Sequence, residues 1–103
     1  MKNESVIPEE IDKIIHEPAR LKIILCLSVL RDADFNYLLY KTKLSRGNLS
    51  IQLQKLEAAD YIEIEKQFIN RVPRTLASLT DKGRKALRQY KDAITELLSG
   101  IDS

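Results

Sequence analysis

The chain is poor in the residues on which disulfides, metal centres and many catalytic sites depend. Its 103 residues include one cysteine, one histidine and three glycines, and no tryptophan. A single cysteine excludes an intrachain disulfide, and one cysteine and one histidine on separate segments cannot form a structural tetrahedral zinc site. We therefore expect neither a metal nor a cofactor. Cys26 lies in the most apolar run of the chain, which predicts a small buried hydrophobe rather than a redox sensor.

Patterns typical of enzymes and membrane proteins are missing as well. The three glycines are isolated, so the sequence contains no glycine-rich phosphate loop. Without a second histidine or cysteine, pairs of nucleophile and base are scarce. No apolar run is long enough to span a membrane, and the first five residues lack the apolar core of a signal peptide. The sequence thus predicts a cytoplasmic protein that is not an enzyme and has no membrane partner.

Charge is nearly balanced over the whole chain but is unevenly distributed along it. The net charge is +2, which is too small to indicate nucleic acid by itself. However, residues 36–55 contain no Asp or Glu, whereas the first 17 residues are rich in acids. The acid-free stretch includes Lys41, Lys43, Arg46 and Lys55. A local basic patch of this kind is typical of a surface that contacts phosphates.

The centre of this stretch predicts an amphipathic helix with a polar front. Ser45 is a suitable N-cap, and Leu49, Leu53 and Leu56 recur at the spacing of a helix face that packs on a core. Most polar helix fronts are simply solvated, so a DNA-binding role depends on the flanking segments. The polar front and its flanks carry side chains that can bond phosphates or base edges, namely Ser45, Arg46, Asn48, Ser50, Ile51, Gln52, Gln54 and Lys55.

A second, shorter helix is expected immediately before the Ser45 helix. Residues 36–43 can form it with Asn36 as the cap, and Leu44 then provides a tight link. Two helices joined in this way, over about residues 36–59, form a helix-turn-helix. In that motif the first helix crosses the DNA backbone and the second lies in the major groove.

The segment after the helix-turn-helix predicts two strands. Apolar and charged residues alternate over 61–66, and residues 75–79 form a second strand candidate. The connector over 67–74 contains no acid, and Pro73 belongs there or at a sheet edge because it cannot donate to a central ladder. Together these segments predict a wing over about 61–79, in which Arg71 and Arg74 are candidate DNA contacts.

Helices are also expected at both ends of the chain. Pro18 fits the first position of a helix running to about Arg31, and residues 33–35 are a candidate third strand. Thr80 fits the cap of a long helix over about 81–99. Apolar stripes near both termini exceed what one domain needs, which predicts a homodimer. The expected interface residues are Ile7, Ile11, Ile14 and Ile15 at the N-terminus, and Leu87, Tyr90, Ile94, Leu97, Leu98 and Ile101 at the C-terminus.

The whole pattern predicts one domain over residues 1–103, mainly α with a small β-wing. This is an α+β winged helix-turn-helix with extra N- and C-terminal helices. Six segments in order carry a resemblance to winged-helix regulators related to the MarR and ArsR groups: residues 17–23, 33–35, 47–50, 53–57, 73–75 and 79–84. Asp60 departs from the family, which usually has Gly after the recognition helix, although Asp tolerates left-handed backbone better than most residues.

The resemblance implies a sequence-specific regulator of transcription that binds double-stranded DNA as a homodimer. Lys41, Lys43, Arg71 and Arg74 would contact phosphates, Asn48, Ser50, Gln52 and Gln54 would read bases, and Ile51 would touch a thymine methyl group. Two alternatives remain. The winged helix could be a protein-interaction subunit of a transcription or replication assembly, or a switch governed by a small molecule. The sequence identifies no effector.

Overall fold

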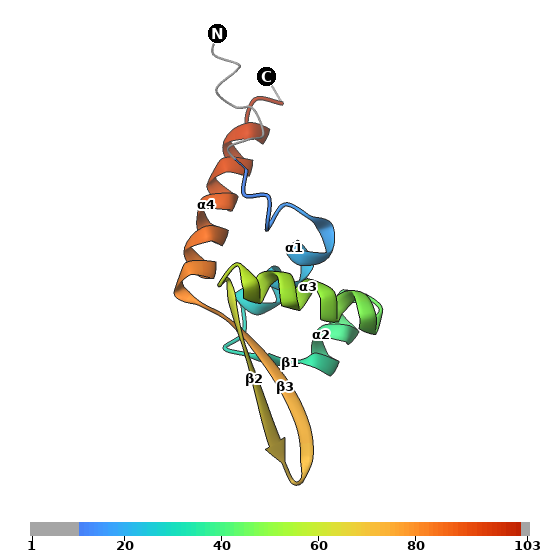
Figure 1. The fold of residues 1–103 in the computed structure, drawn as a ribbon. Helices are drawn as coiled ribbons and strands as arrows, with labels where there is room; N and C mark the ends of the chain where they lie inside the picture. The colour runs from blue at the N-terminus through green and yellow to red at the C-terminus, as the bar shows by residue number, and fades with distance from the viewer. Residues whose placement is uncertain (1–10, 102–103) are drawn as a thin grey trace.

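The computed structural model describes residues 11–101, which fold into four helices and a three-stranded antiparallel sheet (Figure 1). The sheet has the order β1-β3-β2, so the last strand of the chain is central and pairs with both of the others. This arrangement confirms the predicted winged helix-turn-helix fold. Its elements are α1 (Pro18–Ser28), β1 (Ala33–Asp34), α2 (Phe35–Thr42), α3 (Arg46–Ala58), β2 (Ile62–Ile69), β3 (Val72–Leu79) and α4 (Asp81–Leu98).

The core lies where α1 meets α2, α3 and the base of β3. Ile23, Ile24 and Leu27 of α1 are completely buried, because their spacing places them on the inner side of the helix. Helices α2 and α3 close the core on one side with Leu38, Leu49, Leu53 and Leu56. The sheet closes it on another side with Ile62 and Ala77. The core contacts made by α1 make it the central element of the domain. It ends at Ser28, earlier than the predicted Arg31.

Side-chain caps set where most of the helices begin. Ser45 accepts a hydrogen bond from the backbone N–H of Asn48 (3.1 Å), and Thr80 caps α4 in the same way. Both caps were predicted. The predicted cap of α2 was wrong, because Asp34 rather than Asn36 takes that place and accepts from the N–H of Tyr37 (2.7 Å). Pairing with β3 keeps Asp34 extended, which is the backbone state that an N-cap requires.

The wing is a longer and more regular hairpin than the sequence indicated. Strands β2 and β3 pair over eight residues each and are joined by a turn of only Asn70 and Arg71. Both turn residues have left-handed backbone, with φ of 53° and 67°, as the tightest hairpin turns demand. Most of the connector predicted over 67–74 is therefore strand. Since β1 pairs with β3 only at residues 76 and 77, the outer half of the wing is a two-stranded ribbon (Figure 1).

Residues 11–17, directly before α1, form turns instead of the predicted helix. Asp12 accepts hydrogen bonds from the N–H groups of Ile14 (2.8 Å) and Ile15 (3.1 Å), which closes a local turn that competes with helix formation. Ile15 is completely buried, Ile11 is 8% exposed, and Ile14 packs on the core. Ile11 and Ile15 are therefore buried in their own domain, and their placement in the predicted dimer interface was wrong. For Ile14, which is half-exposed, the interface stays a prediction. The remaining residue of that stripe, Ile7, lies outside the described residues.

This N-terminal turn is fastened to the start of the wing. The Tyr61 hydroxyl donates a short hydrogen bond to the Asp12 carboxylate. The pKa of Tyr61 is raised to about 12, mainly because the phenol is partly buried. The hydrogen bond to Asp12 and the negative charge of Asp12 raise it further. The neutral phenol is therefore the form that the fold favours.

A Tyr61→Phe variant is expected to lose part of the alkaline pH dependence of stability. A raised pKa contributes stability that is complete below the ordinary pKa of 10.0 and is lost as the pH rises through about 12. The free energy of unfolding of the wild type should thus fall more steeply across this window than that of the variant. Denaturant titrations at several alkaline pH values measure the difference, and Tyr40→Phe, at an exposed tyrosine, is the control. Parallel pH curves for the wild type and Tyr61→Phe would contradict the assignment.

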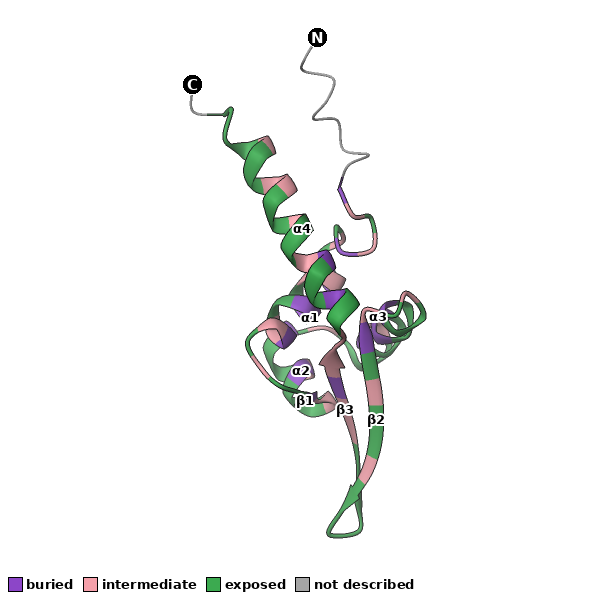
Figure 2. Cartoon of the chain, turned by 90° about the vertical axis from the view of Figure 1, so that its left-hand side faces the viewer, coloured by how far each residue is buried: buried purple, intermediate pink, exposed green. Residues whose placement is uncertain are grey.

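Helix α4 begins against the core and then leaves it. Gly83 and Ala86 are buried, and Leu87 and Tyr90 pack on the core. The later turns project away from the other elements (Figure 2), and there Leu98 and Ile101 are 56% and 70% exposed. Among residues 11–101, no helix is long and apolar enough to cross a membrane.

Cys26 and Asp60 bear on two further expectations from the sequence. The Cys26 thiol is a free side chain at the edge of the core and only half-buried, rather than fully buried as expected. Asp60 follows α3 and has a φ of 66°. It therefore adopts the left-handed conformation that Gly usually provides after a helix.

Candidate nucleic-acid interface

A tight link joins α2 to α3. Lys43 has a left-handed φ of 61°, and its N–H donates to the carbonyl of Leu39 (3.0 Å), which ends α2. The buried hydroxyl of Thr42 donates to the carbonyl of Leu38 (2.7 Å) and satisfies the last turn. Only Lys43, Leu44 and the cap Ser45 separate the two helices. This is the geometry of a helix-turn-helix.

The exposed face of α3 agrees with the face expected from the sequence. Leu49, Leu53 and Leu56 are buried on the inner side. The residues that remain accessible on the outer side are Arg46, Ser50, Ile51, Gln54 and Lys55, and Asn48 is half-exposed. Glu57 is an exposed acid in the last turn of the helix. The first two turns therefore present cationic and polar groups without a competing carboxylate.

Gln52 departs from this pattern, because its side chain faces inward and is not on the accessible front. It is 9% exposed, and both ends of its amide are bonded within the domain. Its Oε1 accepts from Nη1 of Arg20 (2.8 Å), and its Nε2 donates to Oδ1 of Asn48 (2.9 Å). Gln52 is thus not available to read a base, and its placement among the candidate base readers was wrong.

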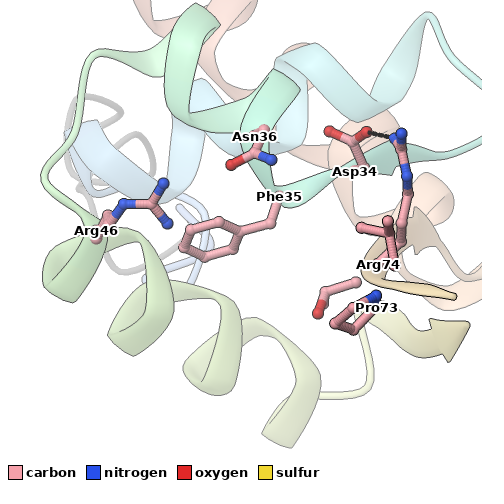
Figure 3. Close-up of a pocket in the computed structure, with 8 residues that line it drawn as sticks. Asp34, Phe35, Asn36, Arg46, Pro73 and Arg74 are labelled. Carbon is pink, nitrogen blue, oxygen red and sulfur yellow. Dashed lines mark hydrogen bonds and ion pairs between the residues drawn. The ribbon is translucent and has the colours of Figure 1, made fainter. Parts of the chain in front are cut away.

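The wing stands beside α3, and two hollows lie between them. The first, of about 360 Å³, lies between the start of α2, the start of α3 and the wing (Figure 3). Its lining residues are Asp34, Phe35, Asn36, Arg46, Val72, Pro73, Arg74 and Thr75. The second, of about 260 Å³, is lined by Phe35, Ser50, Leu53, Gln54, Glu57, Ile64, Lys66 and Thr75. The fold therefore brings the predicted helix and wing residues to one surface, with Phe35 and Thr75 between them.

Aromatic rings support two of the basic side chains on this surface. The Arg46 guanidinium lies 5.8 Å from the centre of the Phe35 ring, and the Lys43 ammonium lies 5.2 Å from that of Tyr40. Both are within the range of cation–π attraction. The rings thus help to hold these cations at the surface, a role that sequence reasoning missed. The spacing of Tyr40 and Lys43 in the helix predicted over 36–43 was a usable signal, whereas no local pattern relates Phe35 to Arg46.

The two wing arginines occupy different environments. Arg74 forms an ion pair with Asp34 (2.8 Å; Figure 3). Its side chain is 46% exposed. Asp34 thus both caps α2 and offsets the charge of Arg74. Arg71 is exposed at the tip of the hairpin. Of the two, Arg71 is the better placed to donate to a phosphate. Lys66 on β2 is an exposed cation beside α3 that sequence reasoning also missed.

A helix-turn-helix followed by a two-stranded ribbon whose outer part carries basic residues and no acid defines a winged helix, a class in which the second helix is suited to a DNA groove. The chain belongs to the winged helix DNA-binding domain family, whose model matches residues 19–98. An uncharacterised protein of Methanocaldococcus jannaschii is 37% identical over 90 residues, which cover 87% of this chain and 98% of that protein.

Solved structures agree with this assignment. A transcriptional regulator homologue from Pyrococcus horikoshii OT3 superposes with a TM-score of 0.88 at 26% identity, over 96% of this chain and 99% of the other. A MarR-like protein from Bacillus cereus ATCC 10987 shares the fold, with a TM-score of 0.69 at 20% identity over 92% and 70% of the two chains. The resemblance to winged-helix regulators inferred from the sequence is confirmed.

Proposed function

We propose that this winged-helix protein regulates transcription by binding specific sites in double-stranded DNA as a homodimer. The observation that carries the proposal is the accessible front of α3, whose first two turns hold no acid, beside a basic wing. A helix fits the width of the major groove. With α3 in that groove, the wing reaches the neighbouring backbone.

The exposed residues divide into two roles. The exposed positions of Lys41 and Lys43 at the end of α2, and of Arg71 at the wing tip, support phosphate contacts by these side chains. Such contacts set the position of a protein on DNA but carry little sequence information. Ser50 and Gln54 are candidate base readers, and Ile51, which is 51% exposed, suits a thymine methyl group. Arg74 contacts DNA only if a phosphate shares it with Asp34.

The free end of α4 supports the dimer. Leu98 and Ile101 are exposed beyond the core, and Ile94 and Leu97 beside them are half-exposed. Pairing of two such helix ends would remove this apolar surface from water, at about 25 cal/mol per Å². A two-fold dimer would also present two α3 helices to successive major grooves of a pseudo-palindromic site.

The protein is expected to bind duplex DNA with an affinity that falls steeply as salt increases. Each phosphate that it neutralises contributes about −0.9 to the slope of log K against log salt. Arg71→Ala should weaken binding to all sequences alike and reduce the magnitude of the slope by about 1. Fluorescence anisotropy over a salt series measures both quantities, and Arg88→Ala, which removes an exposed cation from α4, is the matched control.

Other outcomes would distinguish the alternatives. No DNA binding at low salt, or binding that does not vary with salt, would contradict the proposal and favour a protein-interaction subunit. Equal effects of Arg71→Ala and Arg88→Ala would show that the wing has no special role. Selection of preferred fragments from random duplex DNA would then reveal whether the sites have two-fold symmetry.

A further inference from the structure

A chain of hydrogen bonds runs from the segment before α1 to the first turn of α3. Arg20 of α1 donates from Nε to the carbonyl of Ile14 (2.6 Å) and from Nη1 to Oε1 of Gln52 (2.8 Å). Gln52 donates from Nε2 to Oδ1 of Asn48 (2.9 Å). Asn48 is the third residue of α3. The N-terminal residues of a recognition helix are the ones that contact base edges.

The direction of this chain is set by Arg20. A guanidinium has only N–H donors, so the group that Gln52 turns toward it must be the carbonyl oxygen. The Gln52 NH₂ group then faces Asn48, whose own oxygen must accept. Reversing either amide would set donor against donor at a site where Gln52 is 9% exposed, and a buried unpaired donor is costly.

In this arrangement the side-chain NH₂ group of Asn48 is not used within the chain of hydrogen bonds. Among the described residues, its Nδ2 has no hydrogen-bond partner, and Asn48 is half-exposed. An Asn that pairs with adenine uses its oxygen and its NH₂ group together. In Asn48 the oxygen is already directed back into the protein, which leaves the two N–H donors for an external acceptor.

We propose that Arg20 and Gln52 are positioning residues that make Asn48 present N–H donors to DNA and thereby set its base preference. The inference rests on the proposed function. Guanine, whose O6 and N7 both accept, is the base that this geometry favours in the major groove. Arg20 and Gln52 act without touching DNA themselves. Their effect is therefore on which base is preferred at one position of the site.

The test is to reverse the chain with Gln52→Glu. A glutamate accepts from Arg20 as before but has no donor for Asn48, so the Asn48 amide must turn and donate to it. Its oxygen then faces the groove, where it suits the amino group of adenine or cytosine. Asn48→Asp presents an acceptor by a different route. Both variants should move the preference away from guanine at the same position of each half-site, by about tenfold or more.

Binding of each variant to a library randomised at every position of the selected site measures this shift. Gln89→Glu, at an exposed position of α4, makes the same change in charge and should leave the preference unaltered. If Gln52→Glu does not fold, an unchanged base preference in Asn48→Asp still overturns the inference. A uniform loss of affinity without a shift in preference would overturn the inference and leave the proposed function intact. Absence of any preference in the wild type would overturn both.

Discussion

Replacing Gly83 by alanine should destabilise the protein strongly, although it adds only one methyl group. A β-carbon at this position would lie 2.1 Å from the carbonyl oxygen of Tyr61 and 2.9 Å from its carbonyl carbon. These are backbone atoms, so no side-chain rotation can relieve the clash. The same oxygen accepts from the N–H of Thr80 (3.1 Å), which fastens α4 to the start of the wing. We expect the free energy of unfolding to fall by about 3 kcal/mol or more.

Gly47→Ala provides the matched control. Apart from its chain neighbours and the backbone of its own helix, no atom lies within 4 Å of a β-carbon built at Gly47, and the residue is in the first turn of α3. Alanine there should leave stability unchanged or raise it by up to about 1 kcal/mol. Thermal and denaturant unfolding of both variants measure the contrast. If Gly83→Ala unfolds at the same denaturant concentration as the wild type, the close approach of α4 to Tyr61 is wrong.

The second large effect concerns the free end of α4. A double variant, Leu98→Asp with Ile101→Asp, places two charges on side chains that are 56% and 70% exposed in the single chain. The domain should stay folded, because neither residue belongs to its core. A dimer formed through this surface should dissociate. Affinity for the preferred site should fall at least about a hundredfold, because the second α3 would no longer be held near its half-site.

Sedimentation velocity and DNA titrations check the two halves of this result. Lys85→Asp, at an exposed position on the other side of α4, changes the net charge by the same amount and is the control. We expect only the double variant to lose more affinity for the preferred site than for unrelated DNA. If the wild type sediments as a monomer at tens of micromolar, or if the double variant remains dimeric, the interface lies elsewhere.

Local patterns predicted most of the fold. The caps Ser45 and Thr80 could be identified because capping joins residues two or three positions apart. The alternation that placed Ile62 and Ile64 toward the core was equally local. Asp60 could be assigned a left-handed backbone from its place after a helix. In each case the information lay within a few residues of the feature.

What the sequence could not predict depended on partners distant in the chain. Gln52 looked like a surface residue because its bond to Arg20 spans 32 residues. Arg74 looked like a free cation because its partner Asp34 is 40 residues away. Ile11 and Ile15 looked available for a second chain, but they are buried in their own domain. A periodic pattern shows which residues seek burial and not which surface provides it.

Pro73 has a consequence for the solubility of the wing. Two-stranded ribbons with unpaired edges are templates for edge-to-edge aggregation, and this ribbon exposes Phe68, Ile69 and Val72. The two-residue turn makes Ile69 and Val72 a hydrogen-bonded pair, so the Pro73–Phe68 pair is of the other kind. An N–H at position 73 would therefore point outward along the free edge of β3, and proline has none. A neighbouring molecule that pairs with the free edge of β3 would therefore meet an interrupted ladder at Pro73, which hinders growth of a sheet from that side of the wing.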